Sequence, residues 1–327
     1  MASLALPFHP MKTTRLVVAS LFFVLFTQTP CFSFSLPPPT DPSSSSPQVS
    51  AEEQTANAVQ ATANPAVSMA GQVVGAMGEA LTGQSGKARG LQFKNPVVSL
   101  GLSERNWQDT APGGFTGDDI GADVGLDFDV YDGWIVGFIY NHTYRGASNS
   151  QATSEHMDAD GVSFYTARRF FDLMNAGISY NFVTADHRLT RGVQENLDRD
   201  SHGSTMFVGI SDRTGKWAWS TTTSYTHVFD DYQQQKSLDT GIFTWGGRLG
   251  YDAHELFTVG AAFGHSTMVI QDVFPNSSVR DNDFWTLGPR FSFYPTEDIT
   301  VQVEFDSMQG FADYRSYHIR VGLDVAF

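Results

Sequence analysis

The last stretch of the chain, residues 317–327, alternates strictly between apolar residues and polar or small ones. Alternation with a period of two over about eleven residues predicts a β-strand with one apolar face and one polar face. The chain also ends on this strand with an aromatic residue. The apolar positions are Tyr317, Ile319, Val321, Leu323, Val325 and Phe327.

The same alternation recurs from residue 93 to the end of the chain, in about twelve segments separated by turns rich in Gly, Asp, Asn, Ser and Pro. Strands of about 9–12 residues have the length needed for a tilted crossing of a bilayer. We therefore predict an all-β fold, an antiparallel up-and-down transmembrane β-barrel of about 12 strands. The predicted strands are 95–103, 119–131, 134–144, 160–170, 173–184, 203–212, 216–229, 240–251, 255–264, 284–294, 298–307 and 316–327.

The segment 119–131 shows the pattern most clearly, because every second residue is apolar from Ile120 to Val130. The pair Asp132-Gly133 follows at once and predicts a tight hairpin turn into Trp134. Aromatic residues near strand ends fit the interfacial girdles of a membrane barrel. These residues are Trp107, Trp134, Trp217, Trp285, Tyr251 and Tyr294.

Charged residues fall on the face opposite the apolar one in most of these segments. A soluble sandwich would place such charges outside, whereas a membrane barrel turns its apolar residues toward lipid and its charges into the lumen. Alternation alone does not distinguish the two folds. The predicted lumen charges are Asp123, Asp127, Asp129, Arg169, Arg248, Arg290, Glu304, Asp306, Arg320 and Asp324. We expect these charges to form a salt-bridged interior, with an ion-selective pore as the alternative.

The amino-terminal region has three compositionally distinct parts. Residues 1–35 contain a basic stretch that begins at Met11, the expected start, then an apolar run and small residues, as in a secretory signal peptide. Residues 36–50 form a Pro/Ser-rich linker. Residues 51–92 are Ala-rich, and 66–82 carry an apolar stripe at helical spacing, which predicts a helix. Residues 93–327 form the predicted barrel.

The terminal strand and its final Phe327 resemble those of bacterial outer-membrane β-barrels. The resemblance implies that the six apolar residues of this strand are the recognition signal for the barrel-assembly machinery. It also implies periplasmic chaperones and outer-membrane lipid as partners, and a location in the outer membrane of a Gram-negative envelope.

The helical segment followed by twelve strands resembles the translocator domain of autotransporters. That resemblance covers 93–327 and makes 66–86 the candidate pore helix. It implies that the barrel exports or anchors the segment before it. The segment between signal and barrel lacks β-solenoid repeats, so 51–92 is either a pore helix or a vestigial passenger. The alternatives are a passive diffusion porin or structural barrel and, more remotely, a barrel lipid hydrolase.

Composition excludes several kinds of site. The formal charge of −15 argues against nucleic-acid binding. Cys31 is the only cysteine, so a disulfide framework or a Cys-based metal site is excluded. The tripeptide His202-Gly-Ser204 has the local form of a lipid-hydrolase motif, but Lys216 stands where a supporting Asn would be needed, and we expect a turn there instead. We expect no catalytic residues, no cofactor and no metal.

Overall fold

The computed structural model describes the part of the chain that was predicted to be the barrel. The expected signal peptide, linker and Ala-rich segment, residues 1–35, 36–50 and 51–92, lie outside the described residues. Within the described part, no helix is long and apolar enough to cross a membrane. The described residues are 96–109, 114–131, 134–149, 152–170, 173–191, 193–196, 198–232, 237–271, 283–296, 298–309 and 314–327.

Thirteen strands make up the described fold, and they are joined in one sheet. They are β1 (Val97–Asp109), β2 (Phe115–Tyr131), β3 (Trp134–Asn149), β4 (Ser154–Phe170), β5 (Met174–Arg191), β6 (Val193–Asn196), β7 (Arg199–Thr214), β8 (Trp217–Tyr232), β9 (Leu238–His254), β10 (Phe257–Gln271), β11 (Asp283–Phe293), β12 (Ile299–Gln309) and β13 (Tyr314–Ala326).

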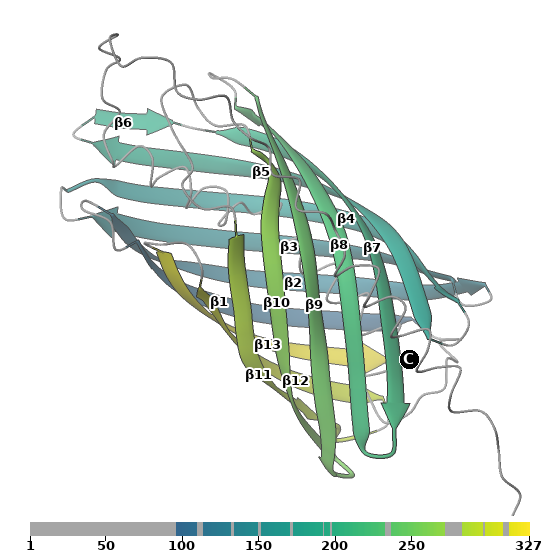
Figure 1. Cartoon of the computed structure of the whole chain (residues 1–327). Helices are drawn as coiled ribbons and strands as arrows, with labels where there is room; N and C mark the ends of the chain where they lie inside the picture. Colours follow the sequence, from purple (N-terminus) through teal and green to yellow (C-terminus); the bar gives the residue numbers. More distant parts are fainter. Residues whose placement is uncertain are drawn as a thin grey trace, which may run out of the picture. The chain divides into compact units, whose positions relative to one another are not determined.

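Twelve of the strands form a closed antiparallel barrel (Figure 1). Each strand pairs with its neighbour in sequence, and the first strand, β1, pairs with the last, β13, from Val97↔Ala326 to Asp109↔Tyr314. The short strand β6 pairs only with the end of β5, so β5 pairs directly with β7 in the ring. The predicted fold, an antiparallel barrel of about 12 strands, is therefore confirmed.

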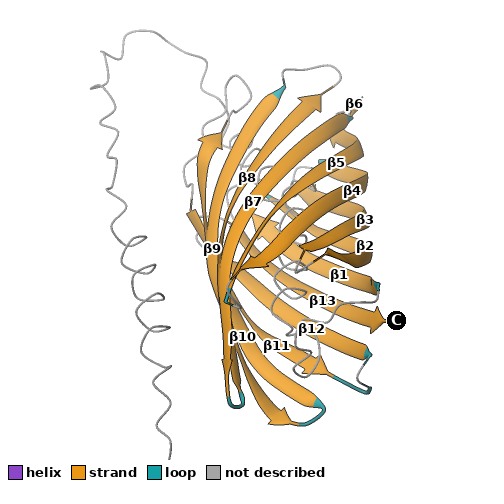
Figure 2. Cartoon of the chain, turned by 90° about the vertical axis from the view of Figure 1, so that its right-hand side faces the viewer, coloured by secondary structure: helices purple, strands orange, loops and turns teal. Residues whose placement is uncertain are grey.

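The two ends of the barrel differ in the length of their connections. At the turn end, 132–133, 215–216 and 255–256 join consecutive strands, and β1 begins and β13 ends there. At the loop end the connections include 192–198, which contains β6, and 272–282. Figure 2 shows the strands from the side, with β13 beside β1. In outer-membrane barrels the short turns are periplasmic and the longer loops extracellular.

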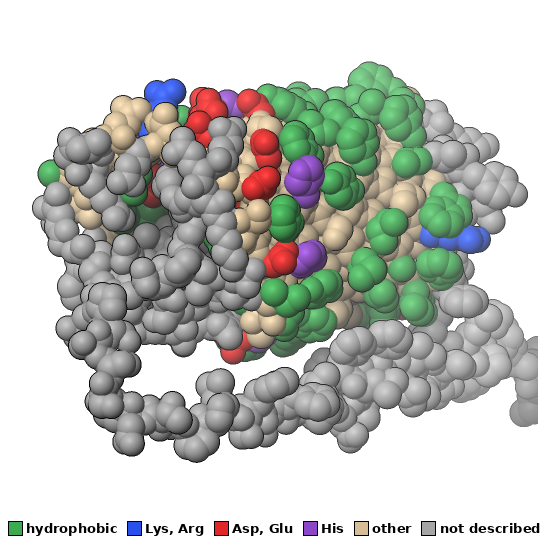
Figure 3. All heavy atoms as spheres, turned by 90° about the horizontal axis from the view of Figure 1, so that it is seen from above, with side chains coloured by type: hydrophobic (Ala, Val, Ile, Leu, Met, Phe, Trp, Pro, Cys, Tyr) green, Lys and Arg blue, Asp and Glu red, His purple; other side chains and the backbone are tan. Residues whose placement is uncertain are grey.

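The outer surface of the barrel is apolar over a broad band, visible as green spheres in Figure 3. Residues at alternate strand positions point outward and are strongly exposed, among them Leu102 at 66%, Leu287 at 63% and Phe164 at 59%. A soluble monomer rarely exposes so large a contiguous apolar surface. The outer surface is therefore apolar and the charges point inward, the reverse of a soluble sandwich. Val124, Val303 and Val321 face outward, whereas Asp127, Arg290 and Arg320 face the lumen.

Two of the predicted interfacial aromatic residues are placed differently. Trp107 and Tyr294 point inward and are buried, so they do not belong to an outer girdle. Trp107 lies at an inward position of β1, and Tyr294 directly follows β11 at the next inward position; composition near strand ends does not reveal which face a residue is on. Trp134, Trp217 and Trp285 lie on the outer surface as expected.

Several strands run further toward the loop end than predicted. For example, β5 has 18 residues and ends at Arg191, whereas the predicted strand stopped at residue 184. Past the apolar band, outward residues such as Asp186 and Arg188 are polar too. Alternation disappears from the sequence where both faces of a strand meet polar surroundings.

The apolar band predicts that an outward charged residue lowers the free energy of unfolding more, the closer it lies to the middle of the band. Phe164 lies on the outer surface midway along β4, four residues from Asp160 and four from Arg168. We expect Phe164→Arg to reduce the free energy of unfolding in phospholipid vesicles by about 2–4 kcal/mol, because the guanidinium would sit near the bilayer midplane. Urea unfolding followed by tryptophan fluorescence measures this loss.

The matched control is Thr184→Arg on the neighbouring strand β5. Thr184 pairs with Asp160, at the edge of the band, so the expected cost there is only about 0–1 kcal/mol. Equal losses for the two variants would contradict a lipid-facing band.

Candidate functional site

The lumen is the candidate functional site, and its inner wall has two different sides. Inward side chains of β3, β4, β5, β7 and β8 form a buried apolar cluster, here called the apolar wall. The charged side chains at inward positions of β2, β9 and β11–β13 are here called the charged wall: Asp123, Asp127, Arg248, Arg290, Glu304, Asp306, Arg320 and Asp324. The apolar wall consists of Ile135, Ile139, Met157, Ala159, Tyr165, Ala167, Val183, Ala185, Phe207 and Val228.

Arg290 of β11 is the centre of the charged wall. Its Nη2 lies 2.7 Å from Asp306 Oδ1 and 2.8 Å from Oδ2, its Nε lies 3.3 Å from Glu304 Oε1, and its Nη1 donates to the carbonyl oxygen of Phe305 at 2.9 Å. Arg248 of β9 approaches Glu304 at 3.9 Å. Two guanidinium groups thus hold two carboxylates against the wall, with both signs of charge compensated locally.

A second ion pair crosses the seam between the first and last strands. Arg320 Nη2 of β13 donates to Asp123 Oδ2 of β2 at 3.0 Å, although β1 lies between these two strands. The intervening position on β1 is Gly101, paired with both Asp123 and Gly322. A Cβ on Gly101 would collide with the Asp123 carboxylate. The missing side chain therefore leaves the space through which the ion pair forms.

The same arrangement recurs on the opposite flank of β2. The Tyr165 hydroxyl of β4 donates a hydrogen bond to Asp127 of β2, across β3. The intervening residue is Gly137, where a Cβ would collide with the Tyr165 ring. Glycine at these inward positions lets long side chains connect strands that are not neighbours in the ladder.

The other predicted lumen charges lie as follows. Asp324 of β13 accepts a hydrogen bond from Gln302 Nε2 at 3.3 Å. Arg169 stands at an inward position of β4, near the turn end and apart from the Arg290 cluster. The side chain of Asp129 lies outside the part of the chain that the structure describes. The six apolar residues of the terminal strand all stand at outward positions of β13 or at its end.

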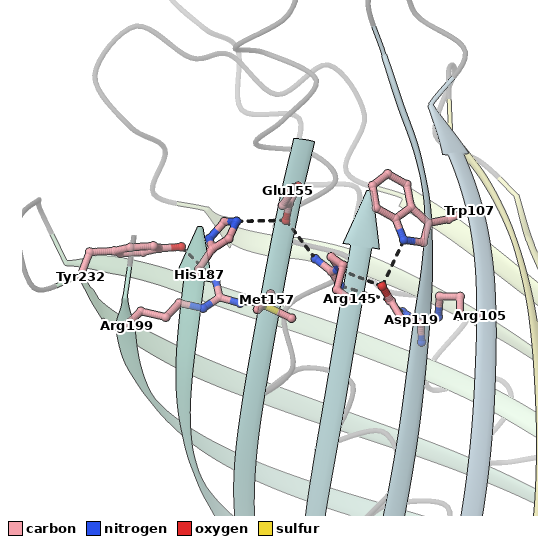
Figure 4. Close-up of polar contacts among 9 residues, drawn as sticks. All are labelled: Arg105, Trp107, Asp119, Arg145, Glu155, Met157, His187, Arg199 and Tyr232. Carbon is pink, nitrogen blue, oxygen red and sulfur yellow. Dashed lines mark hydrogen bonds and ion pairs between the residues drawn. The ribbon is translucent and has the colours of Figure 1, made fainter. Parts of the chain in front are cut away.

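A polar network that the sequence did not predict lines the lumen near the loop end (Figure 4). Asp119 of β2 accepts hydrogen bonds from Trp107 Nε1 at 3.1 Å and from Arg145 Nε at 2.7 Å and Nη2 at 3.1 Å. Arg105 of β1 lies 4.0 Å away from the same carboxylate. A single buried carboxylate is thereby shared by three consecutive strands, β1, β2 and β3.

The network continues onto the next strands. Arg145 Nη1 lies 3.8 Å from Glu155 Oε1 of β4, and His187 Nε2 of β5 lies 3.1 Å from the same oxygen. Farther around the wall, Arg199 of β7 donates to the Tyr232 hydroxyl of β8 at 2.9 Å. Side chains from seven strands thus hold the loop end in one arrangement, and hydrogen-bonded charges of this kind are costly to separate.

An apolar collar also lines the inner wall at the loop end, and it shares Trp107 with the network. Its members come from β1–β3 and β9–β11, and Leu189 and Met308 pack against them. The collar consists of Trp107, Phe115, Ala147, Ile242, Met268 and Phe284.

The alternation of apolar and polar residues did not reveal the loop-end network, because the residues of the network lie past the apolar band. Asp119 is the first residue of the predicted strand 119–131, and Arg145 follows the predicted strand 134–144 by one residue, so the inward parity of these strands would have found both. Glu155 and His187 had no such signal, since outward neighbours such as His156 and Asp186 are also polar.

The tripeptide His202-Gly-Ser204 lies inside β7 and not in a turn, which corrects the expectation for it. Both side chains are at outward positions, and His202 Nδ1 is 2.7 Å from the Tyr180 hydroxyl. Across the described ranges, no group of three His, Cys, Asp or Glu side chains has a geometry that could hold a metal ion.

No protein-family model matches the chain, and no curated protein sequence matches it significantly. Several solved structures, in contrast, are similar to the chain. The translocator domain of the autotransporter NalP from Neisseria meningitidis superposes with a TM-score of 0.58 at 13% identity, covering 83% of this chain and 100% of that one. The β-domain of the Bordetella autotransporter BrkA gives 0.59 at 12% identity, covering 71% and 100%.

An outer-membrane channel from Pseudomonas putida F1 is also similar, with a TM-score of 0.54 at 8% identity, covering 74% of this chain and 100% of the channel. At these identities the likeness shows the fold alone. The chain therefore has the barrel fold that autotransporter translocator domains share with outer-membrane channels.

The seam ion pair gives a test of the charged wall. Arg320→Ala would leave the Asp123 carboxylate, whose side chain is only 6% exposed, without its guanidinium. We expect a loss of about 3 kcal/mol in the free energy of unfolding, because an uncompensated buried charge is costly. Urea unfolding of the refolded barrel in vesicles measures it.

The double variant Arg320→Ala/Asp123→Ala separates the charge from the packing. It should recover a substantial part of the loss, since no buried charge is then left alone. Strictly additive losses from the two single substitutions would contradict the pairing.

Proposed function

We propose that this chain is an outer-membrane barrel that anchors a short amino-terminal segment of its own and holds that segment in its lumen, in the manner of an autotransporter translocator. The observation that carries the proposal is the two-sided inner wall. An apolar wall on one side and a charged wall on the other are suited to an occupant that is itself amphipathic.

The segment 66–82 has this character in its sequence. As a helix it would place Val67, Val74 and Leu81 on one side, with Ser68 and Glu79 on the other. The apolar stripe would pack on the apolar wall, and the polar side would face Arg290 and its partners across the lumen. Its Ala and Gly residues keep the helix thin.

The size of the barrel supports a single occupant. About eight strands leave an interior that side chains fill, whereas 16–18 strands leave an open aqueous channel. A ring of twelve strands lies between these cases, with room for roughly one helix. Since β1 begins at the turn end, the preceding segment would enter the lumen from the periplasmic side.

Delivery and assembly follow from the resemblance to outer-membrane barrels. The signal peptide would direct export, periplasmic chaperones would escort the chain, and the outward side chains of β13 with Phe327 would present the assembly signal. The proposed role is anchoring or export of a segment, without catalysis or a cofactor.

Cross-linking tests the occupant of the lumen. Cys31, the chain's single cysteine, is replaced by Ser, and one cysteine is placed at Val67, Val74 or Leu81 in turn. A second cysteine replaces Val183, a buried member of the apolar wall. We expect a disulfide between Val183→Cys and at least one stripe position when the folded barrel is oxidised.

The matched control is Phe182→Cys, which is the adjacent residue on β5 but faces outward. It should form no disulfide with any stripe position. Equal cross-linking at 182 and 183, or none at 183 from any position, would contradict the proposal.

A diffusion channel is the second candidate, favoured by the likeness to the Pseudomonas channel and by the charges along the inner wall. Planar-bilayer conductance distinguishes the two functions. If the segment fills the lumen, the full chain should conduct poorly and a variant lacking 51–90 should conduct at least several-fold better. Equal conductance of the two would favour the channel.

A further inference from the structure

The pairing of strands around the barrel is interrupted in the middle of one strand pair, β11 with β12. Gly288 and Pro289 of β11 pair with β10 but with no residue of β12, whereas the residues on both sides of them keep one register with β12. In that register Pro289 stands opposite Phe305. Elsewhere in the described ring, pairing departs from regularity only at register shifts near the ends of strands.

Pro289 is the cause of the interruption, because its nitrogen carries no hydrogen to donate to the ladder. In an antiparallel sheet the N–H and C=O of one residue point to the same neighbouring strand, and those of the next residue point to the other. Pairing of Pro289 with Ala261 of β10 is intact, so its nitrogen faces β12. The carbonyl oxygen of Phe305 therefore lacks the backbone donor that a regular ladder would give it.

Arg290 supplies a donor in place of the missing N–H. Its Nη1 lies 2.9 Å from the carbonyl oxygen of Phe305 and 3.1 Å from that of Pro289. The same guanidinium is ion-paired with Glu304 at 3.3 Å and with Asp306 at 2.7 Å. A side chain of the charged wall thus takes part in the hydrogen bonding that closes the barrel.

Gly288 provides the space that this replacement needs. Residue 288 stands at an inward position of β11, and a Cβ there would collide with the carbonyl oxygen of Phe305. This oxygen is therefore turned out of the plane of the ladder toward the lumen, where Arg290 meets it. The three consecutive residues act together, since Pro289 removes a donor, Gly288 admits the carbonyl group and Arg290 binds it.

The inner wall beside Arg290 has a hollow of about 50 Å³. Arg248 and Gly250 of β9, Gly260 of β10 and Glu304 of β12 line it together with Arg290. The guanidinium thus has room to leave the carbonyl oxygen while it stays close to one of its carboxylate partners. The bond that replaces the ladder hydrogen bond can therefore break without displacement of either strand.

We propose that Arg290 is a latch that holds the barrel wall closed between β11 and β12, and that the wall opens there when the guanidinium moves from the Phe305 carbonyl into the hollow. The interrupted pairing and the guanidinium bond together carry this proposal. It goes beyond the proposed function, because it does not depend on what the lumen holds. The latch couples the charged wall to the closure of the barrel.

The test is amide hydrogen exchange, read residue by residue by NMR on the full chain refolded in detergent micelles. The amides of Val303 and Phe305 point toward β11, whereas those of Gln302 and Glu304 point toward β13 and serve as controls on the same strand. We expect Val303 and Phe305 to exchange several-fold faster than the two controls, because opening at β11 exposes only the first pair.

Two substitutions separate the latch from the ion pairs. Pro289→Ala restores a backbone N–H opposite Phe305, so it should slow exchange at Val303 and Phe305 by roughly tenfold, about the effect of one hydrogen bond. Arg290→Ala should speed exchange at the same two amides, and it should do so much less when Pro289→Ala is also present.

An equal effect of Arg290→Ala in both backgrounds would overturn the proposal, because it would mean that Arg290 acts only through Glu304 and Asp306. Equal exchange of the amides on the two sides of β12 in the unaltered barrel would overturn it as well. Pro289→Ala leaves every ion pair in place, so its effect on exchange decides the matter even where Arg290→Ala does not fold.

Discussion

The closed ladder of backbone hydrogen bonds is the constraint on which the rest of this structure depends. Inside a bilayer no water is available for unpaired N–H and C=O groups, so a sheet can cross only if it has no free edge. The pairing of β1 with β13 along the whole of both strands removes that edge. Once the ring is closed, each strand has one face toward hydrocarbon and one toward the lumen, and the alternation of side chains follows.

Closure also explains the interior. Charged groups on the inner wall are partly removed from water, and each must find partners on nearby strands. Direct neighbours supply some, as in Arg290 with Glu304 and Asp306. Glycines supply others by leaving space over an intervening strand, as Gly101 does for Arg320 and Asp123. The seam is therefore joined twice, by backbone pairing and by an ion pair that passes over it.

The apolar wall and the charged wall make the two sides of the lumen chemically different. This difference is not needed for closure of the barrel. It supports the proposal that the lumen holds an amphipathic segment. It arises because charged residues stand at inward positions on some strands and apolar residues stand at inward positions on others.

The sequence by itself determined the fold class, the approximate strand number and the facing of most strands, because a two-residue period survives wherever one face meets lipid and the other does not. Asp123, Asp127, Arg290 and Arg320 could be placed on one face from parity alone. Their partners could not, since contacts across the ladder depend on register, and Asp123 and Arg320 are far apart in the chain.

The loop-end network was missed for a related reason: past the apolar band both faces of a strand are polar, and the periodic signal is lost. Only the tertiary structure decided which inner side chains meet, that the inner wall has two sides, and that Trp107 and Tyr294 point inward. Each of these depends on how twelve strands are brought around into one ring, and no local stretch of sequence encodes that arrangement.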